Sequence, residues 1–437
     1  MTLEIITGLF FGTLLLFVAL GVPLAFVLGG VSAIFLYFTW GPDGFFMVSS
    51  RVWTTMNSFT LISVPLFIFM ALILERTGLA RSLYRMMYLW MGGLRGGLAI
   101  GTVAICTVFA AMVGISGAAV VAMGAVALPA MLERGYDKQM ALGAINAGGG
   151  LGILIPPSVV MIIYSLNTGV SVGSLFAAGI LPGILLAALV GLYIGVRCFL
   201  QPHMGPALAK DERASWPEKL ASVKAVILPI MIVVMVLGSI LSGIATPTEA
   251  AAVGVLGALI CAVVHRTFSL TMAHQAAVKT LVISAMIMWI FIGAHVFTTA
   301  YNAMGAQQLI AELMQNLPGG AFGAMIVMLG IVFVMGMFLD PIGIMLITLP
   351  IFMPVVNQFG FDPIWFGILF IIMMEVGYMT PPFGFNLFYL KGVVPPGVTM
   401  GDIYRSVVPY VLVIFLGMLL IGLVPAIALY LPDVLVR

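Results

Sequence analysis

Long stretches of apolar residues alternate along the chain with short segments that are polar or rich in glycine and proline. Stretches of this length are typical of helices that cross a bilayer, because about 20 apolar residues span its hydrocarbon core. A β-barrel would show short segments of alternating polarity instead. The pattern predicts an all-α polytopic membrane protein, with spans near residues 4–20, 23–40, 60–75, 138–167, 174–197, 225–242, 248–265, 281–303, 363–390 and 407–430.

The composition supports this fold class. Hydrophobic residues make up 63% of the chain and charged residues 7%, and the mean hydropathy is +1.24. Soluble domains carry roughly 25% charged residues. The first residues, MTLEIITGLFF, lack the basic region and the cleavage site of a signal peptide, so we expect a retained first span. No basic stripe points to a nucleic-acid partner.

The basic residues predict the orientation of the spans. If the N-terminus lies outside, 15 of the 17 Lys and Arg residues fall on the inner side, in agreement with the positive-inside rule. Both termini are then periplasmic, and the polar segment 198–224 is a cytoplasmic linker. The inner residues are Arg76, Arg81, Arg85, Arg95, Arg134, Lys138, Arg197, Lys210, Arg213, Lys219, Lys224, Arg266, Lys279, Lys391 and Arg405.

Two apolar stretches, 96–132 and 319–357, do not fit as single spans. Arg95 and Arg134 must share a side although only 38 residues separate them, whereas two full spans need about 40 residues plus a turn. We therefore expect a re-entrant helical hairpin in each stretch, with tips at GISG (114–117) and GMFLDPIG (336–343). Two short tilted spans are the alternative.

The chain resembles itself after a shift of 225 residues, and the matched residues are mostly those that shape the backbone. We expect two repeats, 1–197 and 225–437, each with about five spans, a hairpin and a broken helix. Because five is odd, the second repeat is inverted, as in many secondary transporters. The matched pairs are Pro129 and Pro354, Gly135 and Gly360, Asp137 and Asp362, Gly152 and Gly377, Pro156 and Pro381, Pro157 and Pro382, and Tyr164 and Tyr389.

Glycine and proline interrupt the predicted spans 138–167 and 363–390, at GGGLGILIPPS (148–158) and EVGYMTPPFGFN (375–386). Non-helical backbone at membrane depth is tolerated where protein buries it or where it lines an aqueous cavity. Carbonyls and hydroxyls there can bind a cation, and free N–H groups can bind a carboxylate. Alternatively, these residues only allow kinks and close packing. The candidate site residues are Gly114, Ser116, Gly117, Asn146, Gly149, Gly150, Gly152, Pro156, Pro157, Ser158, Asp340, Pro341, Gly343, Glu375, Gly377, Thr380, Pro381, Pro382 and Asn386.

Charged residues within the apolar stretches are costly and suggest function. Asp340 could hold a cation or fix the hairpin tip through backbone hydrogen bonds. Glu375 could be a proton or cation site, or a structural acceptor, and we favour the structural role. Glu249 begins a helix in GIATPTEAAAVG, so we expect capping. His295 is expected to be a packed residue, and Asn146 and Asn386 could bridge backbone groups or face substrate.

The sequence contains no HExxH, GxSxG or P-loop pattern and no cysteine cluster, so we expect no enzyme and no cofactor. Transport would then be driven by an ion gradient or by a partner. No arginine is predicted at midplane depth, so an anionic substrate would be held by helix dipoles, amides and bound cations.

The segments GIATPTEAAAVG, GISG and PPS and the run E-x-G-x-x-T-P-P-x-G-x-N-L-F (375–388) resemble the large membrane subunit, DctM, of tripartite ATP-independent periplasmic (TRAP) transporters, over essentially the whole chain. The resemblance implies a Na⁺-driven importer of an organic acid in the bacterial inner membrane, with an elevator-type motion. It also implies two partners: a small four-span membrane subunit and a periplasmic substrate-binding protein. The implied Na⁺ sites lie near Ser116, Gly150 and Ser158, and near Asp340, Gly377 and Thr380.

Two other functions compete with this one. The first is a stand-alone Na⁺-coupled dicarboxylate carrier that needs no binding protein. The second is a membrane enzyme or a structural scaffold. This function predicts catalytic groups in the cavity, and transport should survive replacement of Asp340 and Ser116. The expected substrate is a C4-dicarboxylate-like, keto or sugar acid.

Overall fold

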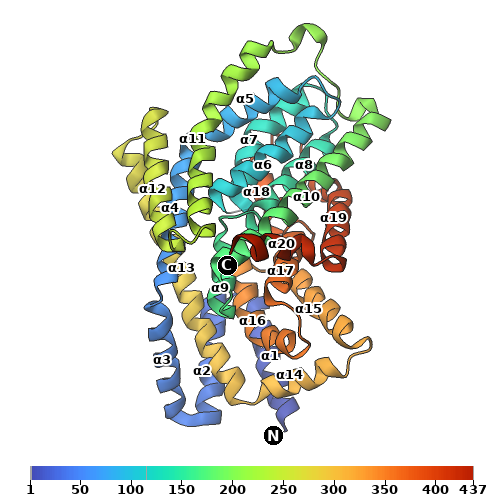
Figure 1. The fold of residues 1–437 in the computed structure, drawn as a ribbon. Coiled ribbons are helices and arrows are strands. Elements are labelled where there is room, and N and C mark those ends of the chain that lie inside the picture. The colour runs from blue at the N-terminus through green and yellow to red at the C-terminus, as the bar shows by residue number, and fades with distance from the viewer. Residues whose placement is uncertain (1, 115, 437) are drawn as a thin grey trace.

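The computed structural model describes residues 2–114 and 116–436, and the regular secondary structure in these residues is entirely helical (Figure 1). Eight helices in this part of the chain are long and apolar enough to cross a membrane. The protein is therefore an all-helical, multi-span membrane protein. Ile115, in the predicted tip of the first hairpin, lies outside the described residues.

One group of long helices forms a column along one side of the molecule (Figure 1). Within it α2 packs along α13, and α4 packs along α12 and α13. Each of these helices is apolar over most of its surface, because one side meets protein and the other meets lipid. The group comprises α2 (Leu24–Trp40), α3 (Gly44–Met56), α4 (Ser63–Arg76), α11 (Trp216–Leu241), α12 (Pro247–Val264) and α13 (Leu270–Ala303). The helix α1 (Leu3–Ala19) packs on α2 and α14, nearer the middle of the molecule (Figure 1).

The second group contains the two hairpin stretches and the two interrupted helices. The first hairpin (α6 and α7) lies in the upper half of Figure 1 and the second (α15 and α16) in the lower half. The members are α6 (Gly97–Val113), α7 (Ser116–Glu133), α8 (Lys138–Gly150), α9 (Val159–Thr168), α10 (Val172–Leu200), α15 (Gly320–Gly336), α16 (Pro341–Gln358), α17 (Pro363–Tyr378), α18 (Phe385–Lys391), α19 (Met400–Leu423) and α20 (Ala426–Leu435).

Two short helices that the sequence analysis missed connect the groups. The helix α5 (Leu79–Met91) links α4 to α6, and α14 (Ala306–Gln315) links α13 to α15. In α5 the apolar residues Leu79 and Leu83 are buried while Arg81 and Arg85 are exposed. This is the periodicity of an amphipathic helix, which a search for continuous apolar runs does not detect.

The predicted last span, 407–430, differs from the structure at both ends. The helix α19 begins earlier, at Met400, because Thr399 and Asp402 form a capping box there. It ends at Leu423, just before Pro425, and a separate helix, α20, then packs on α10. The linker is also shorter than 198–224, because α10 continues to Leu200 and α11 begins at Trp216.

Candidate substrate and ion site at two interrupted helices

The first interruption, residues 151–158 between α8 and α9, will be called the first break. The helix α8 begins after Asp137, whose carboxylate accepts from the Met140 amide at 2.9 Å. After Gly150 one 3-10 turn, Leu151–Ile153, follows, and Ser158 caps α9. The Ser158 hydroxyl donates to the Ile153 carbonyl at 2.7 Å and thereby joins the two sides of the break. The break contains the predicted Gly152, Pro156 and Pro157, with a cis bond between the two prolines.

The second break is residues 379–384, between α17 and α18. The hydroxyl of Thr380 donates to the Val376 carbonyl at 2.7 Å and closes the end of α17. The bond between Pro381 and Pro382 is cis. The amide of Gly384 donates to the carbonyl of Met337 at 3.1 Å, so the break is attached to the second hairpin.

The tip of the first hairpin lies between the two breaks. A Cβ atom on Gly114, which has a φ of +63°, would lie 2.6 Å from the Pro157 carbonyl oxygen of the first break. A Cβ atom on Gly117 would lie 2.6 Å from the ring of Tyr389 in α18. The Ser116 hydroxyl donates to Oδ1 of Asn386, at the start of α18, over 2.8 Å. The tip therefore contacts the first break through its backbone and the region after the second break through its side chain.

The tip of the second hairpin is fixed by Asp340. Its Oδ2 accepts from the amides of Ile342 at 3.1 Å and Gly343 at 3.2 Å, so the carboxylate caps α16, whose first residue is Pro341. Of the two predicted roles, the structure shows the backbone hydrogen bonds. Gly343 packs against the side chain of Leu24 in α2, which brings this tip to the first group of helices.

Glycines mediate close contacts within the second group. The end of α15 crosses α17 at Gly336 and Gly377, and a Cβ on Gly377 would lie 2.7 Å from the Cα of Gly336. The helix α8 approaches α7 at Gly149, where a Cβ would lie 2.4 Å from the Val120 side chain. At these positions only glycine allows the backbones to come so close.

The ends of α8 and α17 meet at Gly150 and Glu375. A Cβ on Gly150 would lie 2.9 Å from Oε1 of Glu375 and 3.0 Å from the sulfur of Met379. Glu375 is fully buried, and neither carboxylate oxygen has a hydrogen-bond partner in residues 2–114 and 116–436. Asn146, one turn before Gly150 in α8, is also fully buried and donates only to the carbonyl of Leu142.

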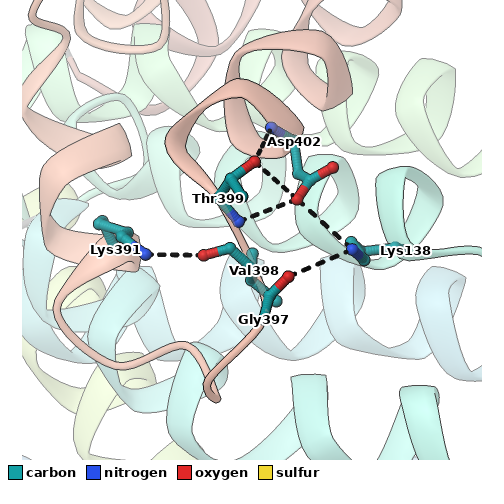
Figure 2. Close-up of polar contacts among 6 residues, drawn as sticks. All are labelled: Lys138, Lys391, Gly397, Val398, Thr399 and Asp402. Carbon is teal, nitrogen blue, oxygen red and sulfur yellow. Dashed lines mark hydrogen bonds and ion pairs between the residues drawn. The ribbon is translucent and has the colours of Figure 1, made fainter.

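Polar contacts connect the ends of the two interrupted helices on the side where the sequence analysis places the cytoplasm (Figure 2). Lys391, the last residue of α18, donates to the Val398 carbonyl at 2.6 Å. Lys138, the first residue of α8, lies 3.4 Å from the carboxylate of Asp402 in α19. These contacts link the start of α8 and the end of α18 to the segment that leads into α19, and they contribute little to stability because they are partly exposed.

Two predictions about polar residues outside the breaks are confirmed. Glu249 forms a capping box, in which its Oε2 accepts from the Thr246 amide at 2.8 Å. His295 is packed in α13, and its Nε2 lies 2.7 Å from the hydroxyl of Thr55 in α3. The candidate site residues did not include Tyr389, Met337 and Gly336, which contact the tips or the breaks, although the last two lie in the predicted second hairpin tip. The 225-residue shift matches Tyr389 with Tyr164, and this match was the one available signal for its position.

The polar donor atoms at the tips and breaks are mainly oxygens. In the described part of the chain, no group of three or more His, Cys, Asp or Glu residues could hold a metal ion. The oxygen donors are carbonyls at the breaks, the hydroxyls of Ser116, Ser158 and Thr380, and the carboxylate of Glu375. Oxygen ligands of this kind bind hard cations.

Comparison with known proteins identifies the family. A family described as "Tripartite ATP-independent periplasmic transporter, DctM component" matches residues 11–427. The chain is 34% identical to a C4-dicarboxylate TRAP transporter large permease protein of Pseudomonas aeruginosa, over 92% of this chain and 93% of that protein. It is 31% identical to an ectoine TRAP transporter large permease protein of Halomonas elongata, over 99% of this chain and 100% of that protein.

The fold is similar to that of a solved transporter structure. The YdaH transporter of Alcanivorax borkumensis superposes with a TM-score of 0.65 over 96% of this chain and 99% of that chain, at 16% identity. At this identity the likeness concerns the fold alone. The family match over nearly the whole chain is decisive: the chain belongs to the DctM family of TRAP transporter large permeases and is a transporter permease rather than an enzyme.

Proposed function

We propose that the chain is the translocating subunit of a Na⁺-coupled, binding-protein-dependent importer of an organic acid anion. The observation that carries the proposal is the position of the first hairpin tip between the two breaks, with Gly114 at Pro157 and Ser116 at Asn386. Carbonyls, amides and hydroxyls from both halves of the chain thus converge in the buried interior of the protein. Such convergence is typical of ion and substrate sites in secondary transporters.

The helix boundaries support two inverted repeats, 1–197 and 225–437. The helices α7 and α16 begin at Ser116 and Pro341 and end at Glu133 and Gln358, which are 225 residues apart at both ends. The helices α8 and α17 also begin 225 residues apart. The two hairpins lie in opposite halves of the molecule (Figure 1), as an inverted second repeat requires.

The two groups of helices support an elevator-type motion. In this proposal, the column that contains α2, α4, α12 and α13 is the static scaffold. The group that contains both hairpins and both breaks carries the substrate across the membrane. The helices α5 and α14 connect the groups in sequence, so they are placed to act as the arms between a fixed and a moving body.

Na⁺ as the coupling ion follows from the donor set. Carbonyls of both breaks and the hydroxyls of Ser116, Ser158 and Thr380 offer the oxygen ligands that a hard cation requires. In the described residues the hydroxyls of Ser158 and Thr380 each donate to one carbonyl, and Ser158 also accepts from the Met161 amide at 3.4 Å. Each hydroxyl oxygen thus keeps at least one lone pair that could coordinate a cation. A bound cation would also attract an organic anion, for which the sequence predicts no arginine at midplane depth.

The relatives compared above are named for different substrates. Its identities to a C4-dicarboxylate permease and to an ectoine permease are 34% and 31%, which are too similar to choose between these substrates. We propose a C4-dicarboxylate-like, keto or sugar acid, with much of the selection made by a periplasmic binding protein. The second proposed partner is a small four-span membrane subunit, in keeping with a family named as tripartite.

The charge distribution supports the proposal that the protein lies in the inner membrane with both termini on the periplasmic side. Arg81 and Arg85 on α5, and Lys138 and Lys391 at the ends of α8 and α18, then all face the cytoplasm. A cysteine-accessibility experiment with an impermeant reagent tests this orientation, using single cysteines placed in the 42–43 turn and the 206–209 loop.

Transport in proteoliposomes tests the proposed function. The chain is reconstituted with the small subunit, and uptake of labelled acids is measured with and without the binding protein and a Na⁺ gradient. We expect uptake only when all components and inward-directed Na⁺ are present. Full uptake by this chain alone would favour the stand-alone carrier, and uptake that persists with choline in place of Na⁺ would refute Na⁺ coupling.

A further inference from the structure

Glu375 and Gly150 occupy equivalent positions in the two proposed repeats and touch each other. Their numbers differ by 225, the offset that aligns the halves. A Cβ on Gly150 would lie 2.9 Å from Oε1 of Glu375 and 3.1 Å from its Cγ. Two equivalent residues can touch only close to the pseudo-two-fold axis that relates the repeats. The contact between Gly150 and Glu375 therefore lies at the axis of the proposed internal symmetry. One half supplies a carboxylate there, and the other supplies the space that the carboxylate fills.

The surroundings of Glu375 offer acceptors but no identified donor. The side chain is 0% exposed, and neither oxygen has a hydrogen-bond partner among residues 2–114 and 116–436. The helix α8 ends at Gly150, and the last carbonyls of a helix carry partial negative charge. Met379 contributes a sulfur atom on the other side of Gly150.

Asn146 adds a second unpaired oxygen to the same face of α8. It lies four residues, about one turn, before Gly150, and it is fully buried. Its Nδ2 donates to the Leu142 carbonyl at 3.3 Å, while Oδ1 has no partner in the described part of the chain. The hydrogen bond from Nδ2 orients the side-chain amide of Asn146, and Oδ1 is left available to coordinate a cation.

An ionised carboxylate in this position is unfavourable without a positive partner. Buried charges are normally paired or bound to an ion, and the negative end of α8 makes the unpaired state worse. No lysine or arginine occurs in α8 after Lys138 or in α17 to supply a partner. A structural acceptor, the role favoured from sequence, would be expected to accept hydrogen bonds from neighbouring N–H groups, and none is found in the described residues.

We propose that Glu375 is the charged ligand of a monovalent-cation site between the end of α8 and α17, completed by Oδ1 of Asn146 and carbonyls of the last turn of α8. This inference rests on the proposed function, because it assigns one of the coupling cations to a new position. It differs from the hairpin-tip sites in that neither hairpin supplies a ligand. Glycine at position 150 leaves the room that the carboxylate occupies, because any Cβ there would lie 2.9 Å from Oε1 of Glu375.

The conservative variant Glu375→Gln tests the proposal, since it keeps the shape and removes the charge. In the reconstituted complex, Na⁺ is titrated against choline at constant ionic strength. We expect the Na⁺ concentration for half-maximal uptake to rise about 10-fold or more, a typical loss when groups that bind or orient a metal are removed. The Hill coefficient for Na⁺ should fall as well. Glu312→Gln, on the exposed face of α14, is the matched control and should leave both values unchanged.

A second readout does not depend on transport. The melting temperature of the purified complex is measured with increasing Na⁺, which stabilises the folded state if it binds there. The Na⁺-dependent increase should be smaller in Glu375→Gln than in the wild type. If Glu375→Gln does not assemble, Asn146→Ala removes the neutral ligand, and its Na⁺ response should also weaken.

The outcomes separate the two proposals. If the wild type shows no Na⁺ dependence of uptake or melting, Na⁺ coupling itself is refuted. If the wild type depends on Na⁺ and Glu375→Gln responds with the same half-saturation and melting increase, the proposed function survives and this cation site does not. In the case that only Asn146→Ala can be prepared, an unchanged Na⁺ response likewise rules the site out.

Discussion

The crossing of α15 and α17 at Gly336 and Gly377 allows a sharp test of how closely the second hairpin must pack. A Cβ on Gly377 would lie 2.7 Å from the Cα of Gly336 and 2.9 Å from the carbonyl oxygen of Phe333. Both atoms belong to the backbone, so no side-chain rotation can relieve the contact. The variant Gly377→Ala therefore forces the end of the hairpin away from α17.

The magnitude follows from two opposing terms. Overpacking of a close contact costs about 1–3 kcal/mol, and a backbone contact belongs at the upper end of that range. Alanine gains up to about 1 kcal/mol over glycine in a helix. The net expectation for Gly377→Ala is a loss of about 2 kcal/mol.

Gly330→Ala is the matched control in α15. A Cβ on Gly330 has no atom within 4 Å, so only the favourable helix term remains. We measure the melting temperature of both variants in detergent and the fraction of correctly assembled complex. Gly377→Ala should melt a few degrees below the wild type and Gly330→Ala at or above it. If the two variants melted alike, the close approach of α15 and α17 would not exist as described.

Three further predictions concern polar contacts. Ser116→Ala leaves Oδ1 of Asn386 unpaired and should lower the free energy of unfolding by about 1–3 kcal/mol. The double variant Ser116→Ala/Asn386→Ala should lose less stability than the sum of the two single variants. Additive losses in this double-mutant cycle would refute the hydrogen bond. Glu249→Ala should lower the melting temperature because it removes the capping box of α12, whereas Glu249→Gln should retain most of the stabilisation. Equal melting temperatures for the wild type and both variants would contradict the cap. Lys138→Met should leave the melting temperature nearly unchanged, because its ion pair is partly exposed, and a large decrease would contradict this assignment.

The helices that cross the membrane fully could be predicted from sequence because each must be apolar for about 20 residues. The connecting helices α5 and α14 could not, since an amphipathic helix is recognised by which face is apolar rather than by a run. The beginning of α19 was missed for a related reason. Asp402 and Arg405 lie in its first turns, where a charge is compatible with a helix end outside the hydrocarbon core.

Part of the candidate site could likewise be predicted from the sequence, and part could not. Gly114 and the two proline pairs could be predicted because glycine and proline indicate where helical backbone stops. The same rule placed both interruptions too early, since Gly148–Gly150 remain in α8 and Glu375–Tyr378 remain in α17. The partner of each tip could not, because 270 residues separate Ser116 from Asn386 and no local pattern encodes a contact at that distance. The 225-residue shift relates equivalent residues, which touch only near an axis, as Gly150 and Glu375 do.

Close packing and ion binding, the two explanations considered for the glycine- and proline-rich breaks, account for different atoms. Packing explains the glycines, since Cβ atoms at Gly114, Gly149 and Gly377 would meet neighbouring atoms at 2.4–2.7 Å. It does not explain the buried oxygens of Glu375 and Oδ1 of Asn146, which have no partner in the described residues and which an apolar core would not retain. The case for the additional cation site therefore rests on these unpaired polar atoms, and in this proposal Gly150 lets α8 come close enough to Glu375 to complete the site.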